Sequence, residues 1–248
     1  MNSAIEEAAQ FLASARKSRR PGDRLPPELQ PQETEAALAI QRRVGDLLGE
    51  PVRGWKCGAP SQGRTLAAPV FRIYTGSQCP VAVFEGKASI EPEIAFVLAR
   101  DLPARTAPYS EDEVRSAVGE TRLAIEILGS RYARSKDATF LEKLADSLSN
   151  DSLYLGPLVR GGLSSELSAF PIRIDGVFEG QGRHPDGHPL AALLWLVNWL
   201  SSRGEGLRAG EAITTGSYAG ALDAPASGPL HAVYGELGEI STELVSAG

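Results

Sequence analysis

Two glutamates, Glu91 and Glu93, stand two residues apart at the start of an apolar stretch that continues to Leu98. Side chains two residues apart in an extended strand project from the same face, so both carboxylates would point to one side. A third, Glu126, lies in an otherwise apolar segment, where an unpaired buried charge is costly. Together they predict an all-oxygen site for a hard divalent cation, Mg²⁺ or Mn²⁺, with positions left for a substrate.

Lys56 lies between Gly54 and Gly58 in a segment that is typical of a short buried strand. Such a lysine either extends its ammonium to the surface or is held by an acidic or metal-bound partner, and the residues alone favour the surface. The polar turn that follows places Ser61 where a ligand could reach it. Later, the small residues of the segment 214–217, Thr215 and Ser217 among them, favour a close approach of backbone to an anionic ligand.

Composition excludes several classes of protein. The chain has 248 residues and a net charge of −6, which argues against a nucleic-acid or anionic-membrane surface. The basic cluster at residues 16–20 is expected to be a solvated helix end. Two cysteines provide no disulfide framework or metal-site spacing, which favours a reducing cytoplasm. The first residues lack the pattern of a signal peptide, and no apolar run approaches the ~20 residues needed to span a membrane.

The expected helices surround the candidate chemistry without contributing to it. Helical periodicity predicts one helix over Ser3–Ser18 and another over Gln32–Leu48, separated by prolines, and we expect residues 1–50 to form a helical arm or subdomain. Ser110 should cap a helix that ends between residues 119 and 121. A core helix is expected from Pro189 to Arg203.

Strands are expected to carry the candidate site. Pro92, between the two glutamates, lacks a ladder donor, so this part of the strand should lie at a sheet edge or bulge. Asp175 and Gly176 predict a hairpin turn. The elements lack the βαβ rhythm of a doubly wound sheet and any glycine-rich phosphate fingerprint. We therefore expect an α+β protein whose residues 51–248 form a mixed, mostly β core behind a helical N-terminal part.

An ordered set of motifs resembles the 2-keto-4-pentenoate hydratase and 4-oxalocrotonate decarboxylase group of the fumarylacetoacetate hydrolase superfamily. The motifs are Gly54–Gly58, Glu91–Leu98, Ala124–Ile127 with Ser130–Arg131, Ala145–Ser147, Gly204–Leu207 and Thr215–Ser217. The resemblance spans nearly the whole chain and implies a β-roll fold. It also implies that Glu91, Glu93 and Glu126 hold the metal, that Lys56 is catalytic, and that Ser61, Asp146, Thr215 and Ser217 bind substrate.

The activity implied by the resemblance is metal-dependent addition of water to a 2-hydroxy-2,4-dienoate, giving a 4-hydroxy-2-oxo acid in the catabolism of aromatic compounds. One alternative is decarboxylation of a 2-oxo acid of the 4-oxalocrotonate type. Another is a non-catalytic subunit that binds a keto acid or supports assembly. The resemblance also leads us to expect a homo-oligomer, or a complex with another enzyme of the pathway.

Residues before the metal strand bear on proton transfer and on the hydrolase alternative. Similar hydratases tend to carry an acidic pair before the metal strand, where this chain has Tyr74–Ser77, so the proton-transfer group is left open. The hydrolase branch uses a histidine before that strand. Because His184, His188 and His231 all follow it, hydrolysis ranks behind hydration and decarboxylation.

Overall fold

The computed structural model describes residues 3–61, 63–84 and 86–246. Its α-helices are α1 (Ser3–Ser18), α2 (Thr34–Leu48), α3 (Glu111–Ala117), α4 (Phe140–Ala145) and α5 (Pro189–Ser202). Its strands are β1 (Gly54–Ser61), β2 (Arg64–Val70), β3 (Ile73–Tyr74), β4 (Gln78–Val81), β5 (Val83–Phe84), β6 (Lys87–Leu98), β7 (Val118–Leu128), β8 (Asn150–Leu158), β9 (Ala169–Ile174), β10 (Phe178–Arg183), β11 (Ala212–Thr214), β12 (Leu222–Pro225), β13 (Gly228–Tyr234) and β14 (Glu239–Ser246).

Local signals fix most helix ends. Helix α1 has the predicted bounds, and α2 ends before Gly49, which adopts the left-handed conformation (φ 68°) that glycine tolerates. Ser110 and Glu113 form a capping box at the start of α3. That helix ends at Ala117, earlier than predicted, because strand β7 begins at the next residue.

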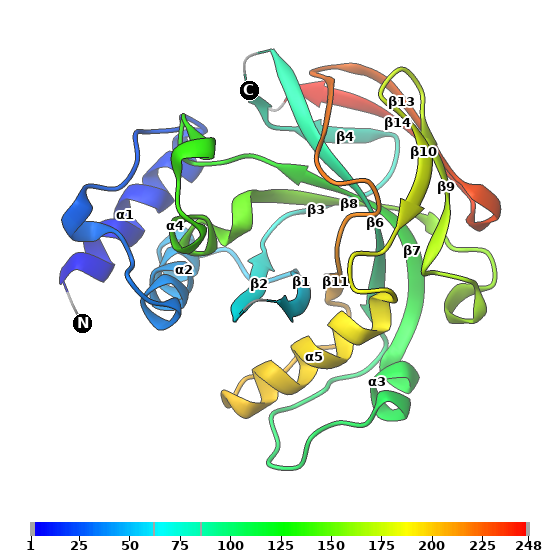
Figure 1. Ribbon diagram of the computed structural model, residues 1–248, viewed down its shortest axis with the longest axis horizontal. Coiled ribbons are helices and arrows are strands. Elements are labelled where there is room, and N and C mark those ends of the chain that lie inside the picture. Colours follow the sequence, from blue (N-terminus) through cyan, green and yellow to red (C-terminus); the bar gives the residue numbers. More distant parts are fainter. Residues whose placement is uncertain (1–2, 62, 85, 247–248) are drawn as a thin grey trace.

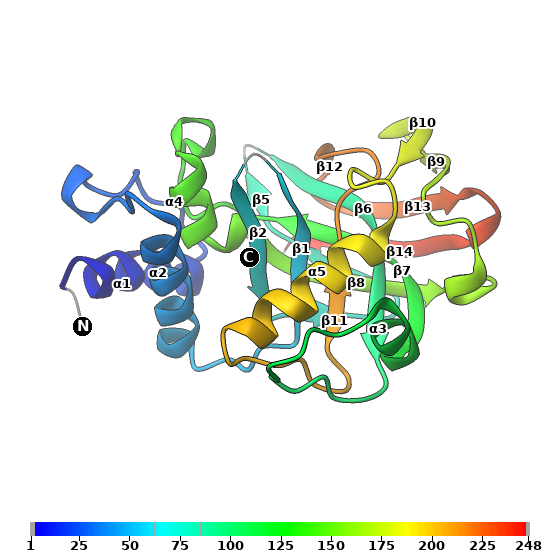
Figure 2. The same ribbon diagram turned by 60° about the horizontal axis from the view of Figure 1, so that its bottom comes forward.

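The described strands form two sheets, of nine and five strands. The larger has the order β2-β1-β11-β6-β7-β8-β3, with β12 and β5 also paired to β6, and the smaller has the order β10-β9-β13-β14-β4. Figures 1 and 2 show the two sheets side by side, with α5 and α3 at one end and α1, α2 and α4 grouped beside the larger sheet. This arrangement confirms the predicted mixed, mostly β core with helices at the N-terminus.

The position of Pro92 differs from the prediction, because β6 is a central strand rather than an edge. It pairs with β7 along one side, and along the other with β12 as far as Ile90 and with β11 from Ala95 onward. Pro92 falls in the gap between these two partners, and its carbonyl accepts a hydrogen bond there from the Tyr218 backbone N–H at 3.0 Å. Since the N and C=O of one strand residue point to the same side, the missing proline donor interrupts no ladder.

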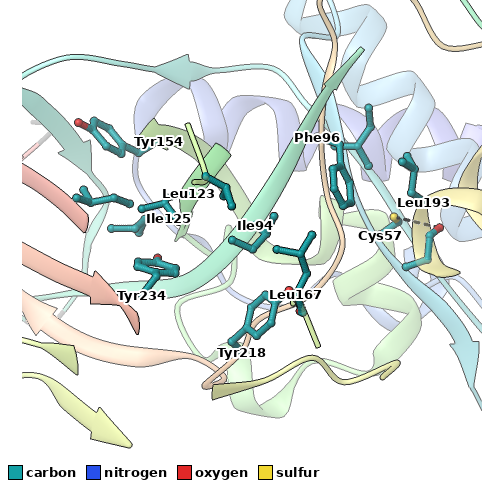
Figure 3. Packing of buried hydrophobic residues seen from close by; sticks show 14 of the residues in the cluster. Cys57, Ile94, Phe96, Leu123, Ile125, Tyr154, Leu167, Leu193, Tyr218 and Tyr234 are labelled. Carbon is teal, nitrogen blue, oxygen red and sulfur yellow. Dashed lines mark hydrogen bonds between the residues drawn. The ribbon is translucent and has the colours of Figure 1, made fainter. Parts of the chain in front are cut away.

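Alternation along β6 separates an apolar face from a carboxylate face. Figure 3 shows Ile94 and Phe96 in the main core with Leu123 and Ile125 of the neighbouring strand β7, all fully buried. The Tyr234 hydroxyl closes this layer by donating to the Ala124 carbonyl at 2.8 Å. Because side chains alternate, the glutamates of β6 project from the opposite face of the same sheet.

A second apolar cluster joins the N-terminal helices to α4. Leu12 of α1, Ile40 of α2 and Leu144 of α4 are buried in it together with Tyr132. Burial of such side chains stabilises the docked helices by about 1.5–3 kcal/mol each. The division into an arm of residues 1–50 and a catalytic domain of residues 51–248 stays a prediction. Among the described residues, no helix is long and apolar enough to cross a membrane.

Candidate active site

Strand register brings the three predicted metal ligands together. Glu91 on β6 lies directly opposite Glu126 on β7, while Glu93 lies opposite the small residue Ala124. Like charges in directly opposite positions destabilise a sheet, so this pairing is unfavourable unless a cation lies between the carboxylates. One oxygen from each of the three glutamates lies within 4.8 Å of the others, and we call these residues the glutamate triad.

Because the triad is buried, its negative charge is unfavourable without a positive partner. The side chains of Glu93 and Glu126 are 1% and 0% exposed, and Glu91 is half-buried. Burial, together with repulsion from Glu126 and Glu91, raises the pKa of Glu93 well above its ordinary value. The pKa of Glu91 is also raised, mainly by burial, although the nearby Lys56 ammonium opposes the shift. A cation at these oxygens would oppose both shifts, because it favours the charged form of each carboxyl group.

The described contacts satisfy only part of the triad. Glu126 Oε1 accepts from Lys56 Nζ at 2.7 Å and from Asn150 Nδ2 at 2.9 Å, whereas Glu126 Oε2 is buried without a partner. Glu93 Oε2 accepts one backbone N–H, from Gly216 at 3.3 Å. One ammonium cannot balance three carboxylates, and the remaining charge together with the unpartnered oxygen fits a divalent ion.

Lys56 reaches the triad across a strand. It lies on β1 beside Thr214 of β11, which in turn pairs with β6. Besides the contact with Glu126, its Nζ lies 3.9 Å from Glu91 and donates to the Leu148 carbonyl at 3.4 Å. Burial lowers the pKa of Lys56, but attraction to Glu126, Glu91 and Glu93 outweighs it, so the pKa is raised and the ammonium persists at neutral pH. The preference for a surface lysine is therefore wrong.

A strained turn immediately before β8 positions two of these contacts. Ser147, Leu148 and Ser149 have φ values of 52°, 52° and 62°, so three consecutive non-glycine residues adopt the left-handed conformation. Each such residue costs about 1–2 kcal/mol, and strain of this kind concentrates at functional sites. The turn aims the Leu148 carbonyl at Lys56 and starts β8 at Asn150, whose amide holds Glu126.

Thr215 and Ser217 lie on the loop that follows β11, next to β6. Ser217 Oγ donates to the Gly220 carbonyl at 3.0 Å and lies 3.5 Å from the Pro92 carbonyl, and the residue between the two hydroxyls, Gly216, binds Glu93. The structure thus brings both predicted substrate-binding hydroxyls to the triad's strand. Their contact with substrate stays a prediction.

His184, 4% exposed, packs against this loop. Its Nδ1 accepts from the Asp186 backbone N–H at 3.1 Å, so the ring proton lies on Nε2, which donates to Thr215 Oγ1 at 3.3 Å. Burial lowers the pKa of His184 to about 4, against the opposing attraction of Asp186. The neutral imidazole therefore orients the Thr215 hydroxyl at physiological pH.

The other two predicted substrate-binding residues lie differently. Asp146 is buried and pairs through its carboxylate with the side chain of Arg131, whose backbone N–H it also accepts at 3.0 Å. Ser61 is exposed at the end of β1, in the hairpin with Arg64. The structure gives Asp146 a role in fixing Arg131, and substrate binding by either residue stays a prediction.

Sequence reasoning did not single out two residues that join the site. Asn150 Nδ2 holds Glu126, and its backbone carbonyl accepts from both Arg131 Nη1, at 2.9 Å, and Arg16 Nη2, at 2.7 Å. Arg16 was expected in a solvated cluster, yet it is 4% exposed, because the end of α1 lies at the start of β8, where Arg16 contacts Asn150. The polar cluster around Asn150 was a visible signal, but no sequence pattern marks the burial of Arg16.

Several known proteins are similar to this chain in sequence or in fold. No family model matched the chain. A 2-keto-4-pentenoate hydratase from Paraburkholderia xenovorans (strain LB400) is 33% identical over 232 residues, covering 86% of this chain and 84% of that protein. The chain belongs to the 2-keto-4-pentenoate hydratase family. A further relative, 2-oxo-hept-4-ene-1,7-dioate hydratase from Escherichia coli, is 27% identical over 85% of this chain and 86% of that protein.

Solved structures of other proteins share the fold of this chain. A 4-oxalocrotonate decarboxylase from Pseudomonas putida G7, complexed with magnesium and adipate, aligns with a TM-score of 0.76 at 19% identity over 98% of this chain and 97% of that one. A fumarylacetoacetate hydrolase family protein from Yersinia pestis CO92 aligns with a TM-score of 0.55 at 18% identity, over 79% and 94%. The predicted family, the fumarylacetoacetate hydrolase-like fold and the assignment to the hydratase-type lyases are confirmed.

Proposed function

We propose that this hydratase-family chain adds water to a 2-hydroxy-2,4-dienoate and releases a 4-hydroxy-2-oxo acid, with Mg²⁺ or Mn²⁺ held by the glutamate triad. The observation that carries the proposal is the buried triad, with its unpartnered oxygen and raised pKa values, facing the ammonium of Lys56. A divalent ion there supplies stabilisation of the negative charge that develops on the 2-oxygen of the substrate.

Lys56 is suited to donate a proton, because the triad keeps it in the ammonium form. Ketonisation moves a proton from the 2-hydroxyl to C5 of the dienoate and makes C4 electrophilic. The oxygen of water then bonds to C4 and its proton to C3. A group that donates to the 2-oxygen and exchanges protons assists both steps, which is the role we assign to Lys56.

The loop after β11 would orient the acid. The Thr215 hydroxyl accepts from His184 and keeps its own hydrogen for a substrate carboxylate, and the Ser217 hydroxyl would rotate away from the Gly220 carbonyl to donate to the same carboxylate. The Gly216 N–H is already engaged by Glu93. We therefore assign substrate positioning to the two hydroxyls and ligand positioning to the glycine.

Decarboxylation of an oxalocrotonate-type acid is the second candidate. It needs the same stabilised charge on the 2-oxygen while carbon dioxide leaves, so the triad supports either reaction. The observation that favours it is the shared fold, because the decarboxylase from Pseudomonas putida G7 covers nearly the whole chain. A non-catalytic subunit is disfavoured, since it would have no use for a buried ammonium paired with unsatisfied carboxylates.

The decisive experiment follows dienol absorbance with Mg²⁺ and then with EDTA, and identifies the product by mass spectrometry. Hydration adds the mass of a water, and decarboxylation removes that of carbon dioxide. Glu126→Gln should abolish the Mg²⁺-dependent reaction, while Glu120→Gln, on the same strand but paired with Arg122, should not. Activity that survives Glu126→Gln, or that ignores EDTA, would reject the metal assignment.

The wider setting follows from composition and from the family. We expect a cytoplasmic enzyme that acts on a small 2-oxo or dienoic acid in aromatic catabolism and has no nucleic-acid or membrane partner. A homo-oligomer, or a complex with another enzyme of the pathway, stays a prediction that sedimentation of the purified chain would test.

A further inference from the structure

The proposed reaction needs a base that Lys56 does not provide. Water must lose a proton as its oxygen bonds to C4 of the substrate, and C3 must gain one. Lys56 is an ammonium held by Glu126 and Glu91, and an ammonium has no lone pair with which to accept a proton. The segment Tyr74–Ser77 contains no carboxylate. The group that takes the proton from water must therefore lie elsewhere in the site.

Asp151 presents a carboxylate to the same cavity as Lys56 and Glu91. The cavity has a volume of about 820 Å³ and is lined by residues of β6, the end of β7 and the start of β8. Asp151 is 8% exposed, and among the described residues its carboxylate has no hydrogen bond or ion pair. Unlike Glu126 Oε2, its oxygens are not enclosed by the protein, so a molecule in the cavity can reach them.

A β-bulge gives this carboxylate its position. Strand β8 pairs with two consecutive residues of β7 through Asn150 and Ser152, so Asp151 between them is an extra residue without a partner. Such a bulge redirects a side chain and is common beside active sites. Gly129 leaves room for it, because a Cβ there would lie only 3.1 Å from the Asp151 Cβ. The bulge and the glycine together place the carboxylate on the cavity wall.

Other candidate bases near the cavity are already engaged. Glu91 belongs to the triad, and Asp223 is exposed and pairs with Lys87 at 2.8 Å. His184 has no free nitrogen, because Nδ1 accepts a backbone N–H and Nε2 contacts a hydroxyl group. Among the described residues of the cavity wall, Asp151 is the carboxylate left to accept a proton.

We infer that Asp151 is the general base of the hydration step. Its carboxylate takes a proton from water as the water oxygen bonds to C4, and it returns that proton to C3. The electron pair of the C3–C4 double bond moves towards the 2-oxygen, beside Lys56, and then forms the new C3–H bond. Water supplies every atom that is added, so no other reactant is needed. The inference rests on the proposed function and deepens it, because it names the residue that activates water.

Asp151→Asn tests the inference, because it keeps the shape of the side chain and removes the base. With 2-hydroxypenta-2,4-dienoate and Mg²⁺, formation of the hydrated product should fall by about 100-fold or more, the range for loss of a general base. Ketonisation needs no activated water and should continue, so that 2-oxopent-3-enoate accumulates. Mass spectrometry separates the two products by the mass of a water. Calorimetric Mg²⁺ affinity should stay the same.

Rescue separates a base from a carboxylate that only balances the nearby charges of Arg16 and Arg72. Added formate should restore part of the hydration in Asp151→Ala and should not accelerate the wild type. Asp223→Asn, which removes another carboxylate from the same wall, should hydrate at the wild-type rate. Circular dichroism checks that each variant folds. If Asp151→Asn does not fold, the formate response of Asp151→Ala decides, and no response would overturn the inference.

The outcomes keep the inference distinct from the proposed reaction. Ketonisation without hydration in Asp151→Asn supports both. Hydration by folded Asp151→Asn at the wild-type rate keeps the proposed reaction and overturns the inference. An equal loss of ketonisation and hydration also overturns it, since a base for water serves the second step alone. A wild type that does not hydrate the dienoate rejects the proposed reaction and, with it, the role of Asp151.

Discussion

The ammonium of Lys56 and the divalent ion proposed at the triad would carry charge of the same sign to the same carboxylates. In the structure Lys56 Nζ lies 2.7 Å from Glu126 and 3.9 Å from Glu91, so it neutralises part of the charge that would bind the ion. In the proposed mechanism Lys56 would therefore weaken metal affinity while serving proton transfer. Removing it should affect the two properties in opposite directions.

Lys56→Met is expected to lower turnover by about 100-fold or more, the range for loss of a general acid. The Mg²⁺ affinity should stay the same or rise, since a competing cation is removed. Steady-state rates and calorimetric Mg²⁺ titration give the two quantities, with Lys17→Met, at an exposed position of α1, as the matched substitution. A rate equal to the wild type would return Lys56 to a structural role.

His184 makes stability depend on pH. Its folded pKa of about 4 lies below the unfolded value near 6.5, so between these values the unfolded chain binds more protons and stability falls as pH falls. From pH 7.5 to 5 this amounts to about 2 kcal/mol. Urea unfolding in EDTA at both pH values should show a smaller loss in His184→Gln than in the wild type. Equal losses would show that His184 does not titrate this way.

Strand β6 and the turn before β8 both position groups of the candidate site, but only the strand could be predicted from the sequence. Side chains alternate along the strand, so Ile94 points into the core and Glu93 into the site. This was predictable because the sequence shows the two-residue period of a strand. The left-handed turn at residues 147–149 was not, since its residues resemble any polar capped turn. The gap that accommodates Pro92 likewise depends on which strands pair with β6.

The strain in this turn can be measured by two substitutions at one position. Ser149 has a φ of 62°, where glycine is unstrained and alanine is not. Ser149→Gly should therefore be more stable than Ser149→Ala by about 1 kcal/mol in urea unfolding. Both variants lack the hydroxyl, so the difference reports backbone strain. A more stable alanine variant would mean that the turn is not left-handed in solution.

For the whole molecule, metal binding should be coupled to folding. Without an ion, the triad holds mutually repelling buried carboxylates, and with it the folded state alone has the complete site. The contacts of the site come from β1, β6, β7, β8 and the loop after β11, so unfolding any of them disperses the ligands. Stability should thus depend on free Mg²⁺.

Mg²⁺ at a hundred times its dissociation constant should raise the free energy of unfolding by about 2.7 kcal/mol, and EDTA should reverse this. Glu93→Gln should lose the Mg²⁺ effect. In EDTA that variant should be at least as stable as the wild type, because one buried repulsive charge is gone. Thermal unfolding with Glu179→Gln, at an exposed position, as control tests both expectations. A Mg²⁺ effect that persists in Glu93→Gln would place the ion elsewhere.

The sequence by itself determined the family, the helices and the carboxylate face, because these depend on local periodicity and on ordered motifs. The tertiary structure alone decided that Lys56 points inward, that Asn150 holds Glu126, and that Arg16 is buried. These contacts join residues far apart in the chain; Arg16 and Asn150 are separated by 134 positions. Local propensity carries no information about such pairs, since packing of the helices and strands sets which distant groups share a low-dielectric interior.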